Sequence, residues 1–269
     1  MKLLNGRELA SYIKERQAKD MRRLANSSVA PKLAIIKTVD NPVIDLYVRL
    51  KGQYAKDIGA LVDIYQIGQE AVPELLEKLN SDNTVHGIII QLPLFDPSKT
   101  DELVNLVSPL KDVDALGDKA LFDPATPMAI LWLLSGYNID FTGKKVVLIG
   151  RGKLVGGPLE KILLSSGVDV TVADSKTKEL SSLTLKADII ITATGRPAVL
   201  KSEMIKLGAV VVDAGVASED GQTVGDVDMQ VFEREDITIT PQKGGVGPLT
   251  ICALFDNVIR AASNSSKNL

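Results

Sequence analysis

Residues 145–160 read KVVLIGRGKLVGGPLE, an apolar run followed by a glycine-rich turn and the start of a helix. This order of strand, turn and helix is typical of the first βα unit of a dinucleotide-binding sheet. Glycine lets the backbone approach a pyrophosphate closely, and the helix N-terminus supplies N–H donors and the positive end of a dipole. The spacing G-x-G-x-x-x-G is one residue longer than the usual fingerprint. On its own, the stretch therefore also suits a tight βα turn that binds no ligand.

On either side of this unit, the chain alternates between short apolar runs and stretches of helical periodicity. This βαβα rhythm predicts parallel sheets covered by helices. Residues 108–127 break the rhythm with prolines and a glycine, and they indicate a functional loop or a domain boundary. We therefore expect an α/β fold of two domains, 1–118 and 119–248, with a Rossmann-type parallel sheet in the second. The apolar runs lie at 32–39, 61–67, 85–92, 145–149, 168–173, 187–192 and 209–213.

The composition excludes several classes of function. With 31 Lys and Arg against 34 Asp and Glu, the net charge of −3 provides no basic field for nucleic acid or an acidic membrane surface. An aromatic content of 4% argues against base stacking. The single cysteine, Cys252, and the single histidine, His86, exclude cysteine-based zinc and paired-histidine sites, so no metal is expected. No signal peptide or membrane span is visible, and we expect a cytoplasmic protein.

Residues after the second strand of the dinucleotide unit bear on which cofactor would bind. That strand, VDVTVAD, ends at Asp174, and an acid at this position commonly binds the adenosine ribose hydroxyls and favours NAD. Arg151, Ser175, Lys176 and Lys178 could instead hold the 2′-phosphate of NADP. Asp174 also suits a turn or helix cap, and the lysines also suit a solvated surface. Both cofactors stay open on these residues alone.

A second group of polar residues lies in the first half of the chain. Tyr47 and Lys51 are four residues apart on a predicted helix, so their side chains share a face. Gln91 closes the strand of HGIIIQLPL, and strand carboxyl ends face the ligand crevice in an open parallel sheet. A phenol, an amine and an amide at such a crevice could position a water and move a proton. The same spacing also suits a packing tyrosine and a lysine that snorkels to solvent.

Several short motifs follow one another along the chain and together carry a resemblance. They are YVRLK (47–51), QLPL (91–94), KDVD (111–114), ATP (125–127), the glycine-rich turn (150–158) and GGVGPLT (244–250). In this combination the chain resembles the methylenetetrahydrofolate dehydrogenase/methenyltetrahydrofolate cyclohydrolase family, the bifunctional FolD proteins, over nearly its whole length. The resemblance implies two α/β domains flanking a cleft, a last helix (about 249–269) that completes the first, folate-binding domain, and a cytosolic homodimer.

The resemblance also implies an activity. The chain would oxidise 5,10-methylenetetrahydrofolate to the 5,10-methenyl form with NADP, and would then hydrolyse that product to 10-formyltetrahydrofolate. Lys51 would be the central catalytic group, held by Tyr47 and Gln91, and Asp114 would hydrogen-bond the pterin ring. A lysine beside the methenyl cation has its ammonium form disfavoured, so its pKa should fall. The other implied contacts are Gly245, Gly247, Pro248 and Leu249 for the folate, and Gly150, Arg151, Gly152, Val155, Gly156, Asp174, Ser175 and Val216 for the dinucleotide.

Departures from the family pattern cluster around the two implied ligand sites. Gly152 replaces a serine and Asp174 replaces a histidine, and both changes weaken a 2′-phosphate site. Ala115 stands where the family has glycine after KDVD, Ile44 replaces a serine, and Lys243 adds a charge near the folate site. Two other functions therefore stay open. One is an NAD-dependent methylenetetrahydrofolate dehydrogenase with weak or no cyclohydrolase activity, and the other is a non-catalytic folate- or dinucleotide-binding regulator.

Overall fold

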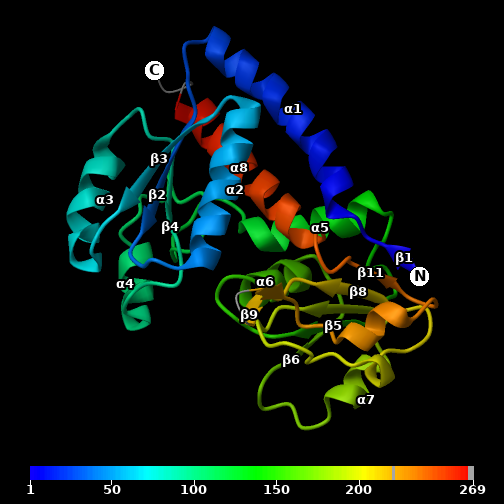
Figure 1. The fold of residues 1–269 in the computed structure, drawn as a ribbon. Coiled ribbons are helices and arrows are strands. Elements are labelled where there is room, and N and C mark those ends of the chain that lie inside the picture. The colour runs from blue at the N-terminus through cyan, green and yellow to red at the C-terminus, as the bar shows by residue number, and fades with distance from the viewer. Residues whose placement is uncertain (220–221, 266–269) are drawn as a thin grey trace. The chain divides into compact units, whose positions relative to one another are not determined.

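Figure 1 shows the computed structural model, which describes residues 1–219 and 222–265. Contacts divide the chain into two units. The first unit holds residues 11–125 and the C-terminal residues from 251, and the second holds residues 1–10 and 126–250. Each unit contains its own parallel sheet with helices. The predicted α/β class, with a Rossmann-type parallel sheet in the second part of the chain, is confirmed.

The first unit is built on a three-stranded parallel sheet in the order β3-β2-β4. Its central strand, KLAIIK, buries residues on both faces, as expected of a parallel strand covered by helices. Ile36, Leu76 and Ile88 meet in its core, and burying each such side chain contributes roughly 1.5–3 kcal/mol. The strands are β2 (Lys32–Lys37), β3 (Leu61–Gln66) and β4 (Gly87–Ile90).

Helix α2 (Pro42–Ile58) has clear signals at both ends. The side chain of Asn41 accepts the backbone N–H groups of Val43 and Ile44, and Pro42 occupies the first turn. Gly59 ends the helix in the left-handed conformation with φ of 86°. The other helices with residues in this unit are α1 (Gly6–Asn26), η1 (Gln69–Ala71), α3 (Val72–Ser81), η2 (Pro97–Lys99), α4 (Thr100–Val104), the first residue of α5 (Ala125–Gly136), and α8 (Val246–Ser265).

The second unit is built on a six-stranded parallel sheet in the order β1-β11-β8-β7-β5-β6. Strand β5 (Val146–Ile149) is fully buried and lies between β6 (Val170–Ala173) and β7 (Ile189–Thr192). The chain therefore leaves β5 on one side and returns on its other side, which creates the switch point where open α/β sheets bind ligands. The remaining elements are α6 (Gly156–Ser165), α7 (Leu180–Thr184), η3 (Ser202–Met204), β8 (Val210–Asp213), the antiparallel pair β9 (Ala217–Glu219) and β10 (Gln222–Val224), η4 (Met229–Glu233) and β11 (Thr238–Ile239).

The N-terminal strand β1 (Lys2–Leu3) belongs to the second unit, whereas the expected boundary assigned residues 1–118 to the first. The reason is backbone pairing at a distance in sequence. Lys2 donates to the carbonyl of Ile237 at 3.0 Å, and Leu4 donates to the carbonyl of Ile239 at 2.8 Å. These bonds add β1 to the edge of the sheet beside β11.

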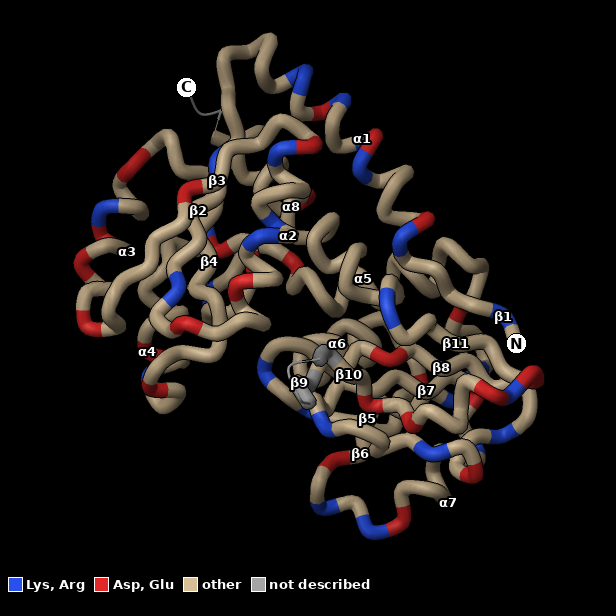
Figure 2. The backbone as a smooth tube through the Cα atoms, viewed as in Figure 1, with Lys and Arg blue, Asp and Glu red and all other residues tan. Residues whose placement is uncertain are grey.

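Positively and negatively charged residues are interspersed along the chain in each unit, as Figure 2 shows. This distribution agrees with the small net charge of −3. Within the described residues, no helix combines the length and the apolar character needed to cross a membrane.

Candidate active site and nucleotide-binding turn

The first candidate site lies where helix α2 meets the end of strand β4. Lys51, in α2, donates from Nζ to the side-chain oxygen Oε1 of Gln91 at 2.6 Å. Gln91 follows β4 directly, and its backbone N–H donates to the carbonyl of Ile36 at 2.8 Å. The structure therefore brings together two of the three residues that the sequence predicted for catalysis.

Tyr47, the third of these residues, lies one helical turn before Lys51 and is likewise half-buried. Helix α2 buries Ile44 and Val48, and Tyr47 and Lys51 lie beside this buried stripe. Burial raises the pKa of the Tyr47 hydroxyl, so the side chain is a neutral phenol that can donate or accept a hydrogen bond.

Lys51 and Asp114 influence one another's charge. Burial lowers the pKa of Lys51, because the ammonium form is disfavoured away from water, and the Asp114 carboxylate opposes this shift. Burial raises the pKa of Asp114 for the corresponding reason, and the Lys51 ammonium opposes that shift. The site thus makes the neutral amine of Lys51 accessible at lower pH than an ordinary lysine would.

The KDVD motif, which carries Asp114, is fixed between strand β4 and helix α8. Ile88 of β4 donates to the carbonyl of Lys111 at 2.8 Å. Asn257 of α8, which is buried, donates from its side chain to the carbonyl of Val113 at 2.9 Å. Sequence reasoning missed Asn257, because its partner lies 144 residues away.

The two acids of the KDVD motif have different surroundings. The buried Asp112 carboxylate accepts the backbone N–H of Gly117 at 2.8 Å and so closes the loop. Asp114 instead interacts with Lys51. Ala115, directly after it, has φ of 55°, in the left-handed region that favours glycine.

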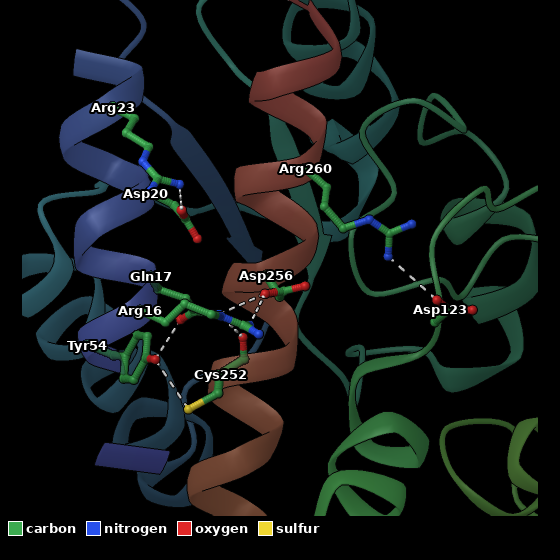
Figure 3. A network of polar contacts seen from close by, with 9 residues as sticks. All are labelled: Arg16, Gln17, Asp20, Arg23, Tyr54, Asp123, Cys252, Asp256 and Arg260. Atoms are coloured by element: carbon green, nitrogen blue, oxygen red, sulfur yellow. Dashed lines mark hydrogen bonds and ion pairs between the residues drawn. The ribbon is translucent and has the colours of Figure 1, made fainter. Parts of the chain in front are cut away.

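A network of side chains holds the Lys51 helix in place, as Figure 3 shows. Tyr54, one turn after Lys51 on α2, donates to the side-chain oxygen of Gln17 on α1 at 2.6 Å and contacts the Cys252 sulfur on α8 at 3.2 Å. Gln17 in turn donates to the carbonyl of Cys252 at 2.8 Å, and the Tyr54 ring stacks on Phe255 with centroids 5.3 Å apart. Burial raises the pKa of Cys252 to about 11, so its thiol is a packed, neutral group.

The glycine-rich turn lies at the carboxyl end of β5, beside β7. Gly150 has φ of 101°, and a Cβ there would lie 2.4 Å from the carbonyl oxygen of Ala193. A Cβ on Gly156 would lie 2.1 Å from the carbonyl oxygen of Gly150. Gly152 differs, since a Cβ there would meet nothing within 4 Å. Two of the glycines are therefore required for a close backbone approach, and helix α6 begins directly after Val155.

The charged residues predicted to contact the dinucleotide have partners within the protein. The Arg151 guanidinium donates from Nε and Nη2 to the two carboxylate oxygens of Glu160, at 2.6 and 2.9 Å. Asp174 accepts the backbone N–H of Lys176 at 2.8 Å, which is the turn-capping role that the sequence left open, and Ser175 is exposed beside it. Sequence reasoning did not single out Glu160.

Two acids, the half-buried Asp213 and the buried Asp226, connect the loops that follow β7 and β8. The Asp213 carboxylate accepts the Thr192 hydroxyl at 3.1 Å and the backbone N–H of Asp226 at 3.1 Å. Asp226, fully buried, accepts the backbone N–H groups of Thr194 at 2.6 Å and Arg196 at 3.0 Å. Both acids thus cap loops. They shape the carboxyl edge of the sheet where the glycine turn lies.

The remaining predicted contacts differ in exposure. Gly247 and Val216 are exposed and Pro248 is half-buried, so these three offer surface to a ligand. Gly245 and Leu249 are buried, and Leu249 has no exposed surface. The Leu249 side chain is therefore a packing residue rather than a direct folate contact.

The lone histidine has a structural role. Nδ1 of His86 accepts the backbone N–H of Lys32 at 3.3 Å, and burial lowers its pKa. Among residues 1–219 and 222–265, no group of three His, Cys, Asp or Glu side chains is placed to hold a metal ion.

Both halves of the chain match known protein-family models. Residues 4–114 match the catalytic domain described as tetrahydrofolate dehydrogenase/cyclohydrolase, and residues 124–266 match the NAD(P)-binding domain of the same description. The first match contains Lys51, Gln91 and Asp114, and the second contains the glycine-rich turn.

Individual relatives extend over nearly the whole chain. The bifunctional protein FolD of Lactobacillus helveticus is 38% identical over 272 residues and covers 96% of each chain. The structure of the FolD methylenetetrahydrofolate dehydrogenase/cyclohydrolase from Campylobacter jejuni has a TM-score of 0.91 at 36% identity, over 98% of this chain and 99% of that one. The Trypanosoma brucei methylenetetrahydrofolate dehydrogenase-cyclohydrolase, solved with NADP and an inhibitor, has a TM-score of 0.92 at 29% identity, over 98% and 97%.

Proposed function

Since this chain belongs to the tetrahydrofolate dehydrogenase/cyclohydrolase family, we propose that it oxidises 5,10-methylenetetrahydrofolate to the 5,10-methenyl form with NADP and hydrolyses the product to 10-formyltetrahydrofolate. The observation that carries this proposal is the hydrogen bond of 2.6 Å between Lys51 and Gln91, in a site that also holds Asp114. An amine with a lowered pKa, an amide and a carboxylate are the groups that hydrolysis of a bound cation needs.

For the oxidation, the residues of the second unit fit a dinucleotide. Gly150 and Gly156 let the turn fold tightly onto the backbone around it, because a Cβ at either position would overlap a carbonyl oxygen, and the N-terminus of α6 follows directly. When bound, NADP supplies the acceptor for the hydride that leaves the methylene carbon. The protein contributes the positions of its backbone N–H groups, and the hydrogen bonds of Asp213 and Asp226 fix the neighbouring loops.

For the hydrolysis, Lys51 is the residue that moves the proton. A water molecule attacks the methenyl carbon, a C–O bond forms, and the neutral Lys51 amine accepts the proton released by that water. The resulting ammonium donates that proton to the departing nitrogen as the C–N bond of the bridge breaks. The hydroxyl of the adduct loses its own proton to solvent as the C=O bond forms, which leaves the formyl group on the other nitrogen. Gln91 accepts a hydrogen bond from Lys51 and so holds its Nζ in place through both steps.

Asp114 and Tyr47 bind the substrate in this proposal. A carboxylate accepts two N–H donors, as an aminopyrimidinone ring presents them. The buried, neutral hydroxyl of Tyr47 lies one turn from Lys51 on the same helix, and it supports the placement of the ring and the water. Among the residues of the GGVGPLT segment, Gly247 and Pro248 keep surface available for the folate.

An absorbance assay tests both activities together. The purified protein is mixed with 5,10-methylenetetrahydrofolate and either NADP or NAD, and the methenyl intermediate is followed as it forms and decays. Formation with NADP followed by decay faster than in buffer supports both reactions. Failure to form the intermediate with either dinucleotide contradicts the dehydrogenase, and accumulation without enzymatic decay contradicts the cyclohydrolase.

One observation favours a second candidate, an NAD-dependent dehydrogenase with weak cyclohydrolase activity. Arg151 is engaged by Glu160, and Gly152 has no hydroxyl to offer a 2′-phosphate. Initial rates at equal concentrations of NADP and NAD separate this candidate from the leading proposal. Turnover with either dinucleotide contradicts a non-catalytic regulator.

We also propose that the protein works as a homodimer in the cytoplasm. The support is the match to one family over nearly the whole chain. Multi-angle light scattering on the purified protein tests the homodimer, with a mass twice that of one chain as the expected result. A mass equal to that of one chain contradicts it.

A further inference from the structure

Arg151 and Glu160 form an ion pair with two hydrogen bonds beside the glycine-rich turn. Arg151 follows Gly150 at the tip of the glycine turn, and Glu160 lies nine residues later in helix α6. Nε donates to one carboxylate oxygen at 2.6 Å and Nη2 donates to the other at 2.9 Å. The Glu160 side chain is 13% exposed, whereas that of Arg151 is 62% exposed. A nearly buried carboxylate therefore anchors a guanidinium that would otherwise extend into solvent.

This geometry uses the part of arginine that recognises phosphate. The planar guanidinium forms two parallel hydrogen bonds with a carboxylate or a phosphate, and Glu160 occupies the Nε and Nη2 edge that could otherwise bind a phosphate in this way. The Glu160 carboxylate also neutralises the positive charge that would attract a 2′-phosphate, and it adds a negative charge nearby. The 2′-hydroxyl of NAD is uncharged, so neither the neutralised guanidinium nor the nearby carboxylate weakens the binding of NAD.

Two neighbouring positions, Gly152 and Asp174, do not replace the phosphate contacts that the pairing removes from Arg151. A 2′-phosphate would gain a hydroxyl donor from a serine at position 152, but Gly152 has no side chain. At the end of β6 stands Asp174, whose carboxylate would repel a phosphate. Its side chain accepts a backbone N–H from Lys176 at 2.8 Å, which keeps it in this turn.

We propose that Glu160 is a specificity-determining residue, which narrows the preference of the enzyme for NADP over NAD by holding Arg151 away from the 2′-phosphate. The inference rests on the proposed function for the identity of the cofactor. It names Glu160 as an additional residue that affects cofactor preference, and it predicts the sign of the effect. Loss of the Glu160 charge should increase selectivity for the phosphorylated dinucleotide.

Direct binding of two small probes tests this without any folate chemistry. Titration calorimetry on the full-length protein measures the Kd of 2′,5′-ADP, which carries the 2′-phosphate, and that of 5′-ADP, which lacks it. For Glu160→Gln, we expect 2′,5′-ADP to bind about tenfold more tightly, while the Kd of 5′-ADP changes by less than about twofold. An unchanged or weaker affinity for 2′,5′-ADP overturns the proposal, because Glu160 would then be neutral or would help to position Arg151.

A double-mutant cycle identifies the route of the effect. In an Arg151→Gln background, Glu160→Gln should change the ratio of the two Kd values much less, because the guanidinium that it would release is gone and only the direct repulsion by the carboxylate remains. If Glu160→Gln raises the affinity for 2′,5′-ADP equally in both backgrounds, the effect does not act through Arg151, and the proposed route is overturned. Glu203→Gln is the matched control, because this exposed residue of η3 lies in the same unit and its loss changes the net charge equally. A gain in that variant also overturns the proposal.

Steady-state rates supply the second readout. The ratio of kcat/KM for NADP to kcat/KM for NAD should rise about tenfold in Glu160→Gln, while the rate of methenyl hydrolysis stays unchanged. If both probes bind but Glu160→Gln changes neither the ratio of their Kd values nor the ratio of kcat/KM for NADP to that for NAD, the inference is overturned and the proposed function stands. If neither probe binds the wild-type protein or any variant, the dinucleotide site itself is wrong, and both proposals are overturned.

Discussion

The amide of Gln91 faces Lys51 with its oxygen, at 2.6 Å from the lysine Nζ, and its nitrogen donates to the carbonyl of Leu92 at 3.3 Å. Both ends of the amide are therefore used, and its orientation is fixed. Since the amide oxygen is aimed at the amine, Gln91 can hold Lys51 both as an ammonium and, with one N–H still donated, as a neutral amine.

Replacement of Lys51 tests the proton-transfer role. We expect Lys51→Met to reduce the rate of methenyl hydrolysis by about 10²–10⁴-fold, because no other amine is paired with Gln91 in the described residues. Methionine fills a similar space, so the circular dichroism spectrum and the thermal unfolding midpoint should match those of the wild type. Gln91→Ala should also slow hydrolysis, by releasing the amine from its position. Unchanged hydrolysis in both variants would contradict the assigned roles.

The pH dependence of hydrolysis tests the charge state of Lys51. Burial lowers the pKa of Lys51, and the neutral amine becomes more populated as the pH rises through that lowered pKa. The saturated rate, corrected for hydrolysis in buffer, should therefore rise with pH and level off below the range of an ordinary lysine.

Asp114→Asn supplies the control for this pH profile. The Asp114 carboxylate favours the ammonium form, so its removal should move the inflection to lower pH, whatever happens to the KM for the folate. An inflection that moves to higher pH, or that is the same in Lys51→Met, would contradict the assignment to Lys51.

Substitution of neighbouring glycines tests the dinucleotide turn. A Cβ at Gly156 would lie 2.1 Å from the carbonyl oxygen of Gly150, so Gly156→Ala must displace the turn, at a cost of about 1–3 kcal/mol in stability. We expect the KM for NADP to rise at least about tenfold, which corresponds to about 1.4 kcal/mol of lost binding. Methenyl hydrolysis should be retained, since Lys51 and Gln91 lie in the other unit.

Gly157→Ala is the matched control for that variant. The nearest atom to its Cβ would be the carbonyl oxygen of Gly152 at 3.4 Å, an ordinary contact, and the residue lies within helix α6. Alanine should be tolerated or mildly stabilising there, by roughly 0.5–1 kcal/mol. Equal effects of the two alanines on the KM for NADP and on thermal unfolding would show that the close approach at Gly156 has no functional role.

The sequence predicted features that depend on local spacing and could not predict those that depend on tertiary placement. Tyr47 and Lys51 share a helix face by periodicity, and Gln91 ends a strand that is apolar throughout. The pairing of Arg151 with Glu160 depends on how the turn folds back on α6, which no spacing rule gives. The partner of Asn257 lies 144 residues away, and this bond depends on where helix α8 packs.

The same reason explains the assignment of the N-terminus. A two-residue strand carries no periodicity of its own, so nothing in Lys2 and Leu3 indicated a place in the second sheet. The N-terminal strand is assigned to the second sheet only by its backbone hydrogen bonds to residues 237 and 239.

The loop after KDVD offers a test of stability at the substrate site. Ala115 has φ of 55°, and a left-handed conformation costs a residue with a Cβ about 1–2 kcal/mol. Glycine removes this cost but gives the unfolded chain more freedom, which offsets about 0.4–1 kcal/mol. Ala115→Gly should therefore raise the free energy of unfolding by about 0.5–1 kcal/mol. The measurement is the midpoint of urea unfolding at unchanged slope. Ala120→Gly, in the same loop but without a left-handed φ, should shift that midpoint in the opposite direction. If both variants lower the midpoint, the backbone at Ala115 is not strained, and the alanine at this position has no cost for the chain.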